Sequence, residues 1–397
     1  MLKEVSVDLT NSHEIVRYRN YVVFTCIYVF LSGFVFVEPS PAEIWFTVAL
    51  PFLILGLRTS KSIIFAFSAL FLPMLLSAFI GLISFGVFNF RFVIIDIYLF
   101  VLFLVLASYA KSLRKDLYQE KFLNQLMISW SLAGTINIIA GGFGYLTGRT
   151  TFYGAWILKY GRLTGFFKDP NVLGPFLIPV SAYFLMRFLK GRGNEFLNLA
   201  FFLFFSFGIL LTFSRAAWLN YAVTIVLLVG TAFLNRSTRL KALGFFVIAA
   251  LIFFVFWYYF ADKVNLLGIS LKDFILARLG LQSYDVERFE AQRKFVDILS
   301  SANAFFGIGP GNYELYSRMA THSLYLRYIG ERGLFGFSLF AVFWLIIVKK
   351  LFKSCNRGFL IPVLFGQLAN SLFIDSLHWR HLWLLIILPF GMKRDEE

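Results

Sequence analysis

The stretch FFGIGPGNYELYSRMATHSLYLRYIGERGLFG (305–336) leads from a turn-rich segment into an apolar run that continues to Val348. Its first part is rich in glycine, proline and asparagine, and Arg318 and His322 then follow at a spacing of four residues. A helix through both positions would place them on one face. Because His322 stands just before the apolar run, we expect its imidazole at a membrane surface rather than in the middle of the bilayer.

The rest of the chain repeats such long apolar runs. Of the 397 residues, 59% are hydrophobic and 20% are aromatic, whereas only 15% are charged, against about 25% in a typical soluble domain. Runs of roughly 18–22 residues recur between Tyr21 and Phe390, which is long enough to cross a bilayer as helices and too long for the strands of a barrel. The composition therefore predicts an all-α polytopic membrane protein.

We expect a single transmembrane domain over 1–397 with about twelve transmembrane helices. Lysine and arginine gather in alternate short connections, which places these connections and both termini in the cytoplasm. The predicted spans lie near residues 20–37, 43–57, 62–82, 92–109, 122–140, 171–189, 196–213, 216–234, 242–260, 321–348, 358–374 and 378–392.

Two long loops, 141–170 and 261–320, fall on the opposite, periplasmic side. Long loops in compact domains are usually functional, so these two are the first candidates for a site. The larger loop is expected to be partly helical, with an amphipathic helix over 284–299. Its apolar stripe is predicted to lie on the outer membrane surface or to cap a cavity, and consists of Phe289, Gln292, Val296 and Leu299.

The net charge of +15 comes from basic residues in the short loops between apolar runs. This distribution indicates anionic membrane lipids or a phosphate-bearing lipid substrate, and not nucleic acid. The two cysteines, Cys26 and Cys355, form no CxxC motif, and the sequence contains neither an HExxH motif nor a DxD pair for a metal-bound nucleotide sugar. We therefore expect no metal and no cofactor.

Four basic or titratable residues are predicted to meet on the outer side. Arg162 lies in GRLTGFFKDPN (161–171), Arg215 in LTFSRAAW (211–218), Arg288 in the loop helix, and His322 at the start of the next span. A guanidinium group suits phosphate oxygens because it can bind them in a bidentate manner. Two apolar segments flank Arg215 with almost no loop, which favours a functional or buried-pair role. For the other two arginines, snorkelling to lipid headgroups is an equal alternative.

His322 has the chemistry of a general base, with an interfacial histidine bonded to a neighbour as the alternative. Lys168, beside the turn Asp169-Pro170-Asn171, is a further candidate for a phosphate contact. Arg318, Asp375 and His378 are accessory candidates, although Trp379 and Trp383 would also fit an aromatic belt with anchoring charges. The GIGPGN run (307–312) lacks the Lys-Ser/Thr of a P-loop, so we expect a tight re-entry turn there.

Taken in order, GRLTGFFKDPNVLG (161–174), LTFSRAAW, Arg288, GIGPGNYE (307–314) and HSLYLRYIGERGLFGF (322–337) resemble the bacterial O-antigen ligase and O-antigen polymerase superfamily over roughly residues 160–345. The resemblance implies a metal-independent, inverting glycosyltransferase of the bacterial inner membrane. Such a protein moves a glycan from an undecaprenyl-diphosphate carrier to an acceptor hydroxyl on the periplasmic side. It also implies that Arg162, Arg215 and Arg288 bind the diphosphate, and that His322 and Arg215 are catalytic.

The acceptor is left open by these residues. A ligase would use a lipid A-core and a polymerase another glycan chain, in lipopolysaccharide or polysaccharide biosynthesis, with a chain-length regulator as a possible partner. The last-span sequence DSLHWRHLW (375–383) is closer to exopolysaccharide-type polymerases. The alternatives from other classes are a lipid-linked glycan flippase or secondary transporter, and a non-catalytic scaffold. Asp96, inside a span, is the kind of charge a transporter uses, but no inverted repeat is evident.

Overall fold

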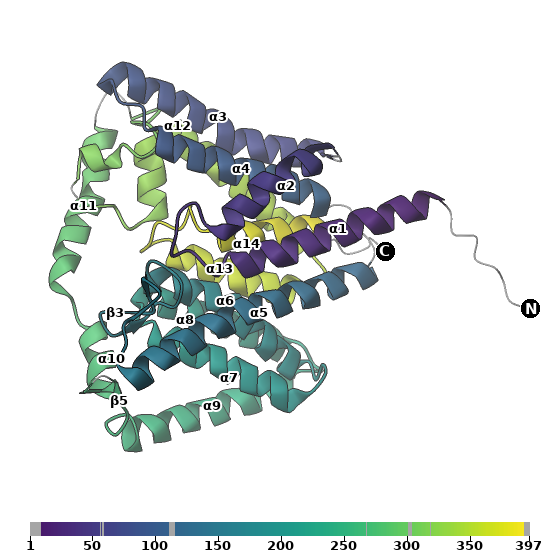
Figure 1. Ribbon diagram of the computed structural model, residues 1–397, viewed down its shortest axis with the longest axis vertical. Helices are drawn as coiled ribbons and strands as arrows, with labels where there is room; N and C mark the ends of the chain where they lie inside the picture. The colour runs from purple at the N-terminus through teal and green to yellow at the C-terminus, as the bar shows by residue number, and fades with distance from the viewer. Residues whose placement is uncertain are drawn as a thin grey trace, which may run out of the picture.

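The computed structural model describes residues 9–55, 57, 59–110, 116–266, 268–300, 304–317 and 319–392. A bundle of long helices makes up most of the protein (Figure 1). Its helices are α1 (Leu9–Leu31), α2 (Pro41–Leu55), α3 (Lys61–Phe85), α4 (Phe90–Ala110), α5 (Asp116–Thr147), α6 (Pro170–Leu189), α7 (Glu195–Leu211), α8 (Arg215–Leu234), α9 (Arg239–Tyr259), α12 (Leu324–Phe352), α13 (Arg357–Asn370) and α14 (Arg380–Gly391).

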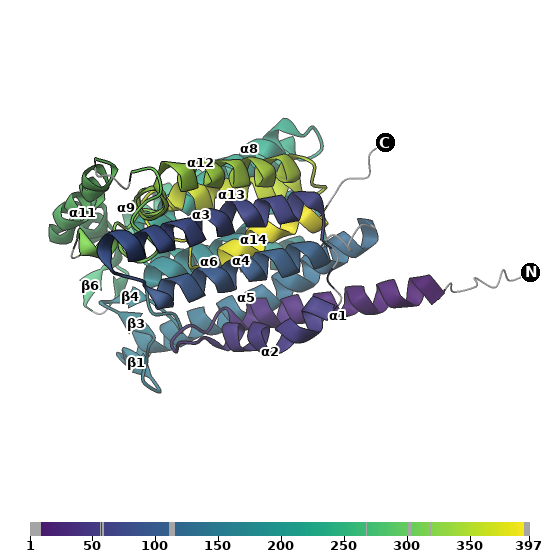
Figure 2. The same ribbon diagram turned by 90° about the horizontal axis from the view of Figure 1, so that it is seen from above.

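Shorter elements cover one end of the bundle, which we call the outer end. Figure 2 shows α11 and the hairpins together there, whereas α1 begins and α14 ends at the opposite, inner end. A chain that begins and ends at the same end of the bundle would cross it an even number of times. The elements of the outer end are α10 (Leu271–Leu279), α11 (Ser283–Leu299), the 3₁₀ turn η1 (Tyr313–Leu315) and three antiparallel hairpins formed by β1 (Thr151–Phe152) with β2 (Ala155–Trp156), β3 (Leu158–Lys159) with β4 (Arg162–Leu163), and β5 (Asn265–Leu266) with β6 (Ile269–Ser270).

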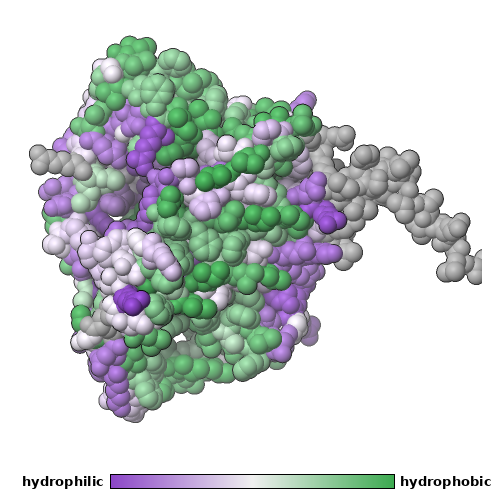
Figure 3. Space-filling view, viewed as in Figure 1, coloured by the Kyte–Doolittle hydropathy of each residue, from purple (hydrophilic) through white to green (hydrophobic). Residues whose placement is uncertain are grey.

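The all-α polytopic membrane fold is confirmed. Among the described residues, seven helices are long and apolar enough to cross a membrane, namely α3, α4, α5 from Gln119, α6, α8, α9 and α12. Three further apolar helices, α2, α7 and α14, are shorter, so the number of twelve crossings stays a prediction. Figure 3 shows apolar residues along the sides of the helices, with hydrophilic residues gathered toward the two ends of the bundle.

The structure differs from the predicted boundaries on the outer side. The first span was expected to reach residue 37, but α1 ends at Leu31, and the amide of Val35 donates to the carbonyl of Phe166 at 2.8 Å. This bond draws the chain after α1 onto the outer loop. The loop expected over 141–170 is shorter because α5 continues to Thr147, and the two hairpins in the remainder were not predicted.

Helix α6 occupies the centre of the bundle and positions the outer site. In the most apolar 18-residue stretch of α6, 78% of the residues are buried. In the corresponding stretch of α9 only 6% are buried, so α9 is exposed along most of its length. Gly174 makes the close packing possible, since a Cβ there would lie 2.5 Å from the Cβ of Ala217 in α8. Asp169 caps the helix by accepting a hydrogen bond from the amide of Asn171 at 2.7 Å. The starts of α6 and α8 are thereby held side by side.

The long apolar helix predicted after His322 is α12, and it is broken at Gly333, where φ is 65°. In a continuous helix the carbonyls of Gly330 and Glu331 would accept from the amides four residues later. Here they accept instead from the amides of Ile308 and Gly309, at 3.2 and 2.9 Å. The amides of Leu334 and Phe335 donate to the carbonyls of Ala304 and Phe305, at 3.0 and 2.9 Å.

The segment 304–309 therefore replaces the hydrogen bonds that α12 loses at its break. Glycines allow the close approach, because a Cβ on Gly307 would lie 2.4 Å from the backbone of Glu331. Backbone of irregular shape is tolerated inside a membrane protein only when its polar groups find partners in this way. The re-entry turn expected from GIGPGN (307–312) is present in this form.

Candidate active site

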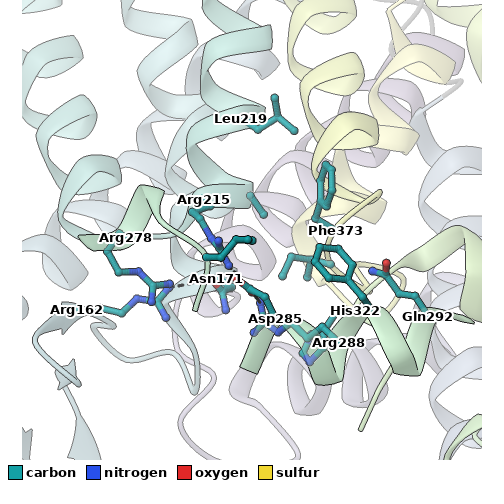
Figure 4. Close-up of a pocket in the computed structure, with 14 residues that line it drawn as sticks. Arg162, Asn171, Arg215, Leu219, Arg278, Asp285, Arg288, Gln292, His322 and Phe373 are labelled. Carbon is teal, nitrogen blue, oxygen red and sulfur yellow. Dashed lines mark hydrogen bonds and ion pairs between the residues drawn. The ribbon is translucent and has the colours of Figure 1, made fainter. Parts of the chain in front are cut away.

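A cavity of about 290 Å³ lies at the outer end, where α6 and α8 begin and α11 passes across them (Figure 4). The four residues singled out in the sequence all line it, although they come from four separate segments. The lining comprises Arg162, Arg215, Arg278 and Arg288, the polar residues Asn171, Asp285, Gln292 and His322, and the apolar residues Ala216, Leu219, Leu281, Phe289, Phe373 and Ile374.

Arg162 belongs to strand β4 and is held from two sides. Its Nε donates to the carbonyl of Thr212 at 2.9 Å, and a terminal nitrogen donates to Oδ1 of Asn171 at 2.9 Å. The preceding turn brings it into place, since Tyr160 and Gly161 both have left-handed φ values, 52° and 71°. Burial, and next the charge of Arg278, lowers the pKa of Arg162 to about 10, so the group stays protonated at neutral pH.

Arg215 is the first residue of α8. The chain turns sharply before it, because Phe213 has a left-handed φ of 46° and the side chain of Ser214 caps the helix through the amide of Ala217 at 3.3 Å. One terminal nitrogen of Arg215 donates to Oδ1 of Asp285 at 2.5 Å, and the other donates to the carbonyl of Gly280 at 3.3 Å. The arginine thus connects the start of α8 to the junction of α10 and α11.

Arg278, which lines the cavity, and Tyr284, which contacts two of the arginines, were not predicted from the sequence. The Nε of Arg278 donates to the carbonyl of Phe213 at 3.2 Å, and its Nη1 donates to the hydroxyl of Tyr284 at 2.7 Å. The ring of the same tyrosine lies under the guanidinium of Arg288, 4.6 Å from ring centre to Cζ. Tyr284 therefore orients two arginines at once.

Asp285 is the single carboxylate among the described residues that line the cavity, against four arginines. Burial raises the pKa of Asp285, but hydrogen bonds from Arg215 and from the amide of Gln282 outweigh it, and the pKa lies below its ordinary value. The carboxylate also lies 4.0 Å from Arg288. With one negative charge against four positive ones, the cavity attracts anions.

His322 precedes α12 and has a strained backbone, with a left-handed φ of 48°. The next residues hold it, because Ser323 caps α12 and the amide of Leu324 donates to the carbonyl of Ser371 at 3.0 Å. Burial, and next the positive charge of Arg288, lowers the pKa of His322 below 6.5. Within the described chain its imidazole makes no hydrogen bond, so a neutral ring nitrogen is free to accept a proton at neutral pH.

Of the other predicted residues, Lys168 was expected to contact the diphosphate, and Arg318, Asp375 and His378 were accessory candidates. Lys168 does not line the cavity, and its ammonium pairs with Glu38 at 2.7 Å on the outer surface. Asp375 and His378 do not line the cavity either; Asp375 accepts from Arg327 at 3.0 Å and lies 3.8 Å from His378. Arg318 lies outside the residues that the structure describes.

A buried network of charges surrounds the break in α12, next to the cavity. Arg327 pairs with Glu314, Glu331 and Asp375 at 3.1, 2.8 and 3.0 Å. Arg332 is ion-paired with Asp96 of α4, and also with Glu331 at 3.3 Å. Asp96 therefore has an arginine partner inside the bundle. This ion pair gives a structural reason for a carboxylate within a span.

Residues 200–341 match the protein family described as O-antigen ligase. The matched segment contains Arg215, Arg278, Asp285, Arg288 and His322, whereas Arg162 precedes it. No match was found among curated proteins. The resemblance to the O-antigen ligase and polymerase superfamily is thus confirmed over this part of the chain, which contributes most of the charged lining of the cavity.

Proposed function

We propose that this chain, whose residues 200–341 match the O-antigen ligase family, is a membrane glycosyltransferase that takes a glycan from an undecaprenyl-diphosphate carrier. It transfers the glycan to an acceptor hydroxyl on the periplasmic side of the bacterial inner membrane, with both termini in the cytoplasm. The observation that carries the proposal is that Arg162, Arg215, Arg288 and His322 line one cavity although they come from separate segments.

The arginines suit the leaving group. When the bond between the anomeric carbon and the phosphate oxygen breaks, negative charge builds up on the departing diphosphate. Guanidinium groups already in place stabilise this charge in the transition state, and each such donor contributes about 3 kcal/mol. Four of them supply positive charge of the kind that a divalent cation gives in other transferases, so we propose a metal-independent reaction.

His322 is the proposed general base. Its neutral imidazole takes the proton of the acceptor hydroxyl while the hydroxyl oxygen attacks the anomeric carbon. Attack comes from the side opposite to the diphosphate, so the new glycosidic bond has the inverted configuration. Asp285 is not suited to this role, because its carboxylate is already bonded to Arg215. Its proposed role is to position Arg215 and Arg288.

The cavity also has an apolar side that suits a polyprenyl carrier. Leu219 and Phe373 line it next to the arginines, and in Figure 4 both lie on the side toward the bundle. They are 37% and 49% exposed, so apolar surface continues out of the cavity. We propose that the diphosphate binds the arginines and that the first isoprene units lie against this wall. A lipid A-core and a growing glycan are both compatible acceptors.

Reconstituted transfer tests the proposal. The full chain is placed in lipid nanodiscs with a synthetic undecaprenyl-diphosphate glycan and an acceptor, and the product is identified by mass. Arg215→Ala should lower the rate at least about 100-fold, the loss of one preplaced donor. Arg91→Ala is the matched control, since Arg91 is an exposed outer arginine paired with Glu38 at 3.1 Å. Movement of the lipid across the bilayer without a new glycosidic bond would instead identify a flippase.

A further inference from the structure

A second cavity, of about 460 Å³, lies at the inner end of the bundle. It is bounded by the ends of α6, α8 and α12 and by the starts of α9 and α13. The first cavity lies at the start of α8 and the second at its end, so the 20 residues of this helix separate them by about 30 Å. Nothing in the proposed transfer reaction uses this second cavity.

Two cations at the inner cavity form no direct ion pair within the described part of the chain. Lys190 and Arg357 both line it, and neither forms an ion pair with a carboxylate of the described chain. Their neighbours at the same end do: Arg192 pairs with Glu120 at 2.5 Å, and Lys241 is ion-paired with Glu195. Among the described residues, these two cations therefore lack the direct ion pair that their neighbours have.

Two helix starts at the inner cavity also attract negative charge. Helices α9 and α13 begin at this cavity, and their N-cap residues, Thr238 and Asn356, make no side-chain capping bond. At the start of α13 the amides of Arg357 and Phe359 donate to the carbonyls of Ser354 and Asn356, at 3.2 and 2.9 Å, so negative charge is attracted there by the helix dipole. Gly358, in the first turn of α13, lines the cavity, and a Cβ on it would meet nothing within 4 Å. A phosphate group can approach the backbone closely at this point.

The remaining lining is apolar and continues along the spans. Leu189 ends α6, Leu228 and Ile361 lie in the last two turns of α8 and the first two turns of α13, and Phe352 ends α12. An ion such as free phosphate would gain nothing from this surface, whereas the acyl chain of a membrane lipid would pack against it. The cavity thus combines a cationic rim with an apolar wall between membrane helices.

We propose that the inner cavity binds one anionic phospholipid of the inner leaflet. Its phosphate lies between Lys190 and Arg357 near the start of α13, and one acyl chain lies along Leu228 and Ile361. Basic cavities between membrane helices on the cytoplasmic side are known to hold anionic headgroups.

Native mass spectrometry of the full chain with added phosphatidylglycerol tests this proposal. The Lys190→Gln/Arg357→Gln variant should bind the lipid about 30-fold more weakly, because two unpaired charges are removed. The Arg192→Gln/Lys241→Gln variant loses the same number of charges from the same end, but from ion-paired positions, and should bind like the wild type. Thermal unfolding of both variants, measured without added lipid, checks that each is folded.

Three outcomes would overturn the proposal. Equal loss in both variants would show that only the overall charge of the inner end matters. Equal binding of phosphatidylcholine by the wild type would show that the charge of the lipid is not recognised. Full competition by inorganic phosphate, with no added affinity from the acyl chains, would identify a simple anion site.

Discussion

His322 has a left-handed backbone conformation that costs a residue with a side chain about 1 kcal/mol. The cost is offset by the contacts that fix the start of α12, among them the bond from Leu324 to Ser371. In the proposed reaction, this strained conformation holds the imidazole at the wall of the cavity that four arginines also line. Burial and the neighbouring arginine also determine the protonation of the His322 imidazole.

The pH dependence of transfer follows from this environment. Burial and the charge of Arg288 lower the pKa of His322, so the neutral base persists to a pH below 6.5 and is lost as the pH falls through that lower pKa. The acid limb of the kcat/KM profile should therefore have its midpoint below 6.5. In Arg288→Gln the midpoint should rise, even though the maximal rate falls. An acid limb at the same pH in both proteins would contradict a base next to Arg288.

Arg278 should contribute to donor binding although no sequence motif marks it. Arg278→Ala removes a charged donor from the cavity and should weaken binding of the lipid-linked donor about 10- to 100-fold. Tyr284→Phe keeps the ring under Arg288 but removes the 2.7 Å bond that orients Arg278, so its effect should be about fivefold. Donor affinity in nanodiscs measures both. If Tyr284→Phe weakened binding more than Arg278→Ala, the bond between them would not be the reason.

At the scale of the elements, α11 was predicted at 284–299 and is present over Ser283–Leu299, and Phe289 and Gln292 of the predicted stripe line the outer cavity. Phe289 and Val296 of the predicted apolar stripe are half exposed, whereas Asp285, Ala291 and Ile298 are buried. The bond between Asp285 and Arg215 brings a carboxylate into the buried part of this helix. Periodicity alone favoured the apolar stripe, and the sequence does not reveal that a partner 70 residues away would draw a carboxylate inward.

Local patterns made the apolar spans and the glycine-rich turn predictable. Arg278, Asp285 and Tyr284 were not, because each acquires its role only through contacts with distant segments, such as the carbonyl of Phe213. The outer hairpins were missed for a similar reason: their strands have only two residues each, too short for an alternating pattern.

The break in α12 depends on glycine. Gly333→Ala places a Cβ 2.3 Å from the carbonyl oxygen of Phe305, at a left-handed φ of 65°. The variant should be destabilised by more than about 2 kcal/mol, from backbone strain together with the clash. Gly244→Ala is the control, since a Cβ there meets nothing within 4 Å and alanine favours the helix. Thermal unfolding in detergent compares them. An equally stable Gly333→Ala protein would rule out the observed packing of 304–309.

On the scale of the whole molecule, the charge network holds together parts that are far apart in the sequence. Arg327 and Arg332 connect α12 to Asp96 of α4, to the re-entrant segment through Glu314, and to the turn that contains Asp375. This turn continues into the apolar wall of the outer cavity at Phe373 and Ile374. The bundle and the site are thus stabilised by the same ion pairs.

Asp96→Asn should therefore act on stability. It leaves Arg332 buried with Glu331 as its remaining acidic partner, which costs about 3–5 kcal/mol. Replacing both residues, as Asp96→Leu/Arg332→Met, removes the uncompensated charge and should recover most of that loss. Thermal unfolding measures the loss of stability, and transfer assays of the protein that remains folded measure the effect on activity. A stable Asp96→Asn protein with abolished lipid movement would favour the transporter alternative instead.

The most direct test of the central claim separates donor binding from transfer in one experiment with the His322→Ala variant. Donor affinity and single-turnover transfer are measured on the full chain in nanodiscs with the same undecaprenyl-diphosphate glycan. The variant should bind the donor like the wild type, because the arginines are intact, and should transfer at least about 100-fold more slowly without its base. Transfer at the wild-type rate would contradict the account.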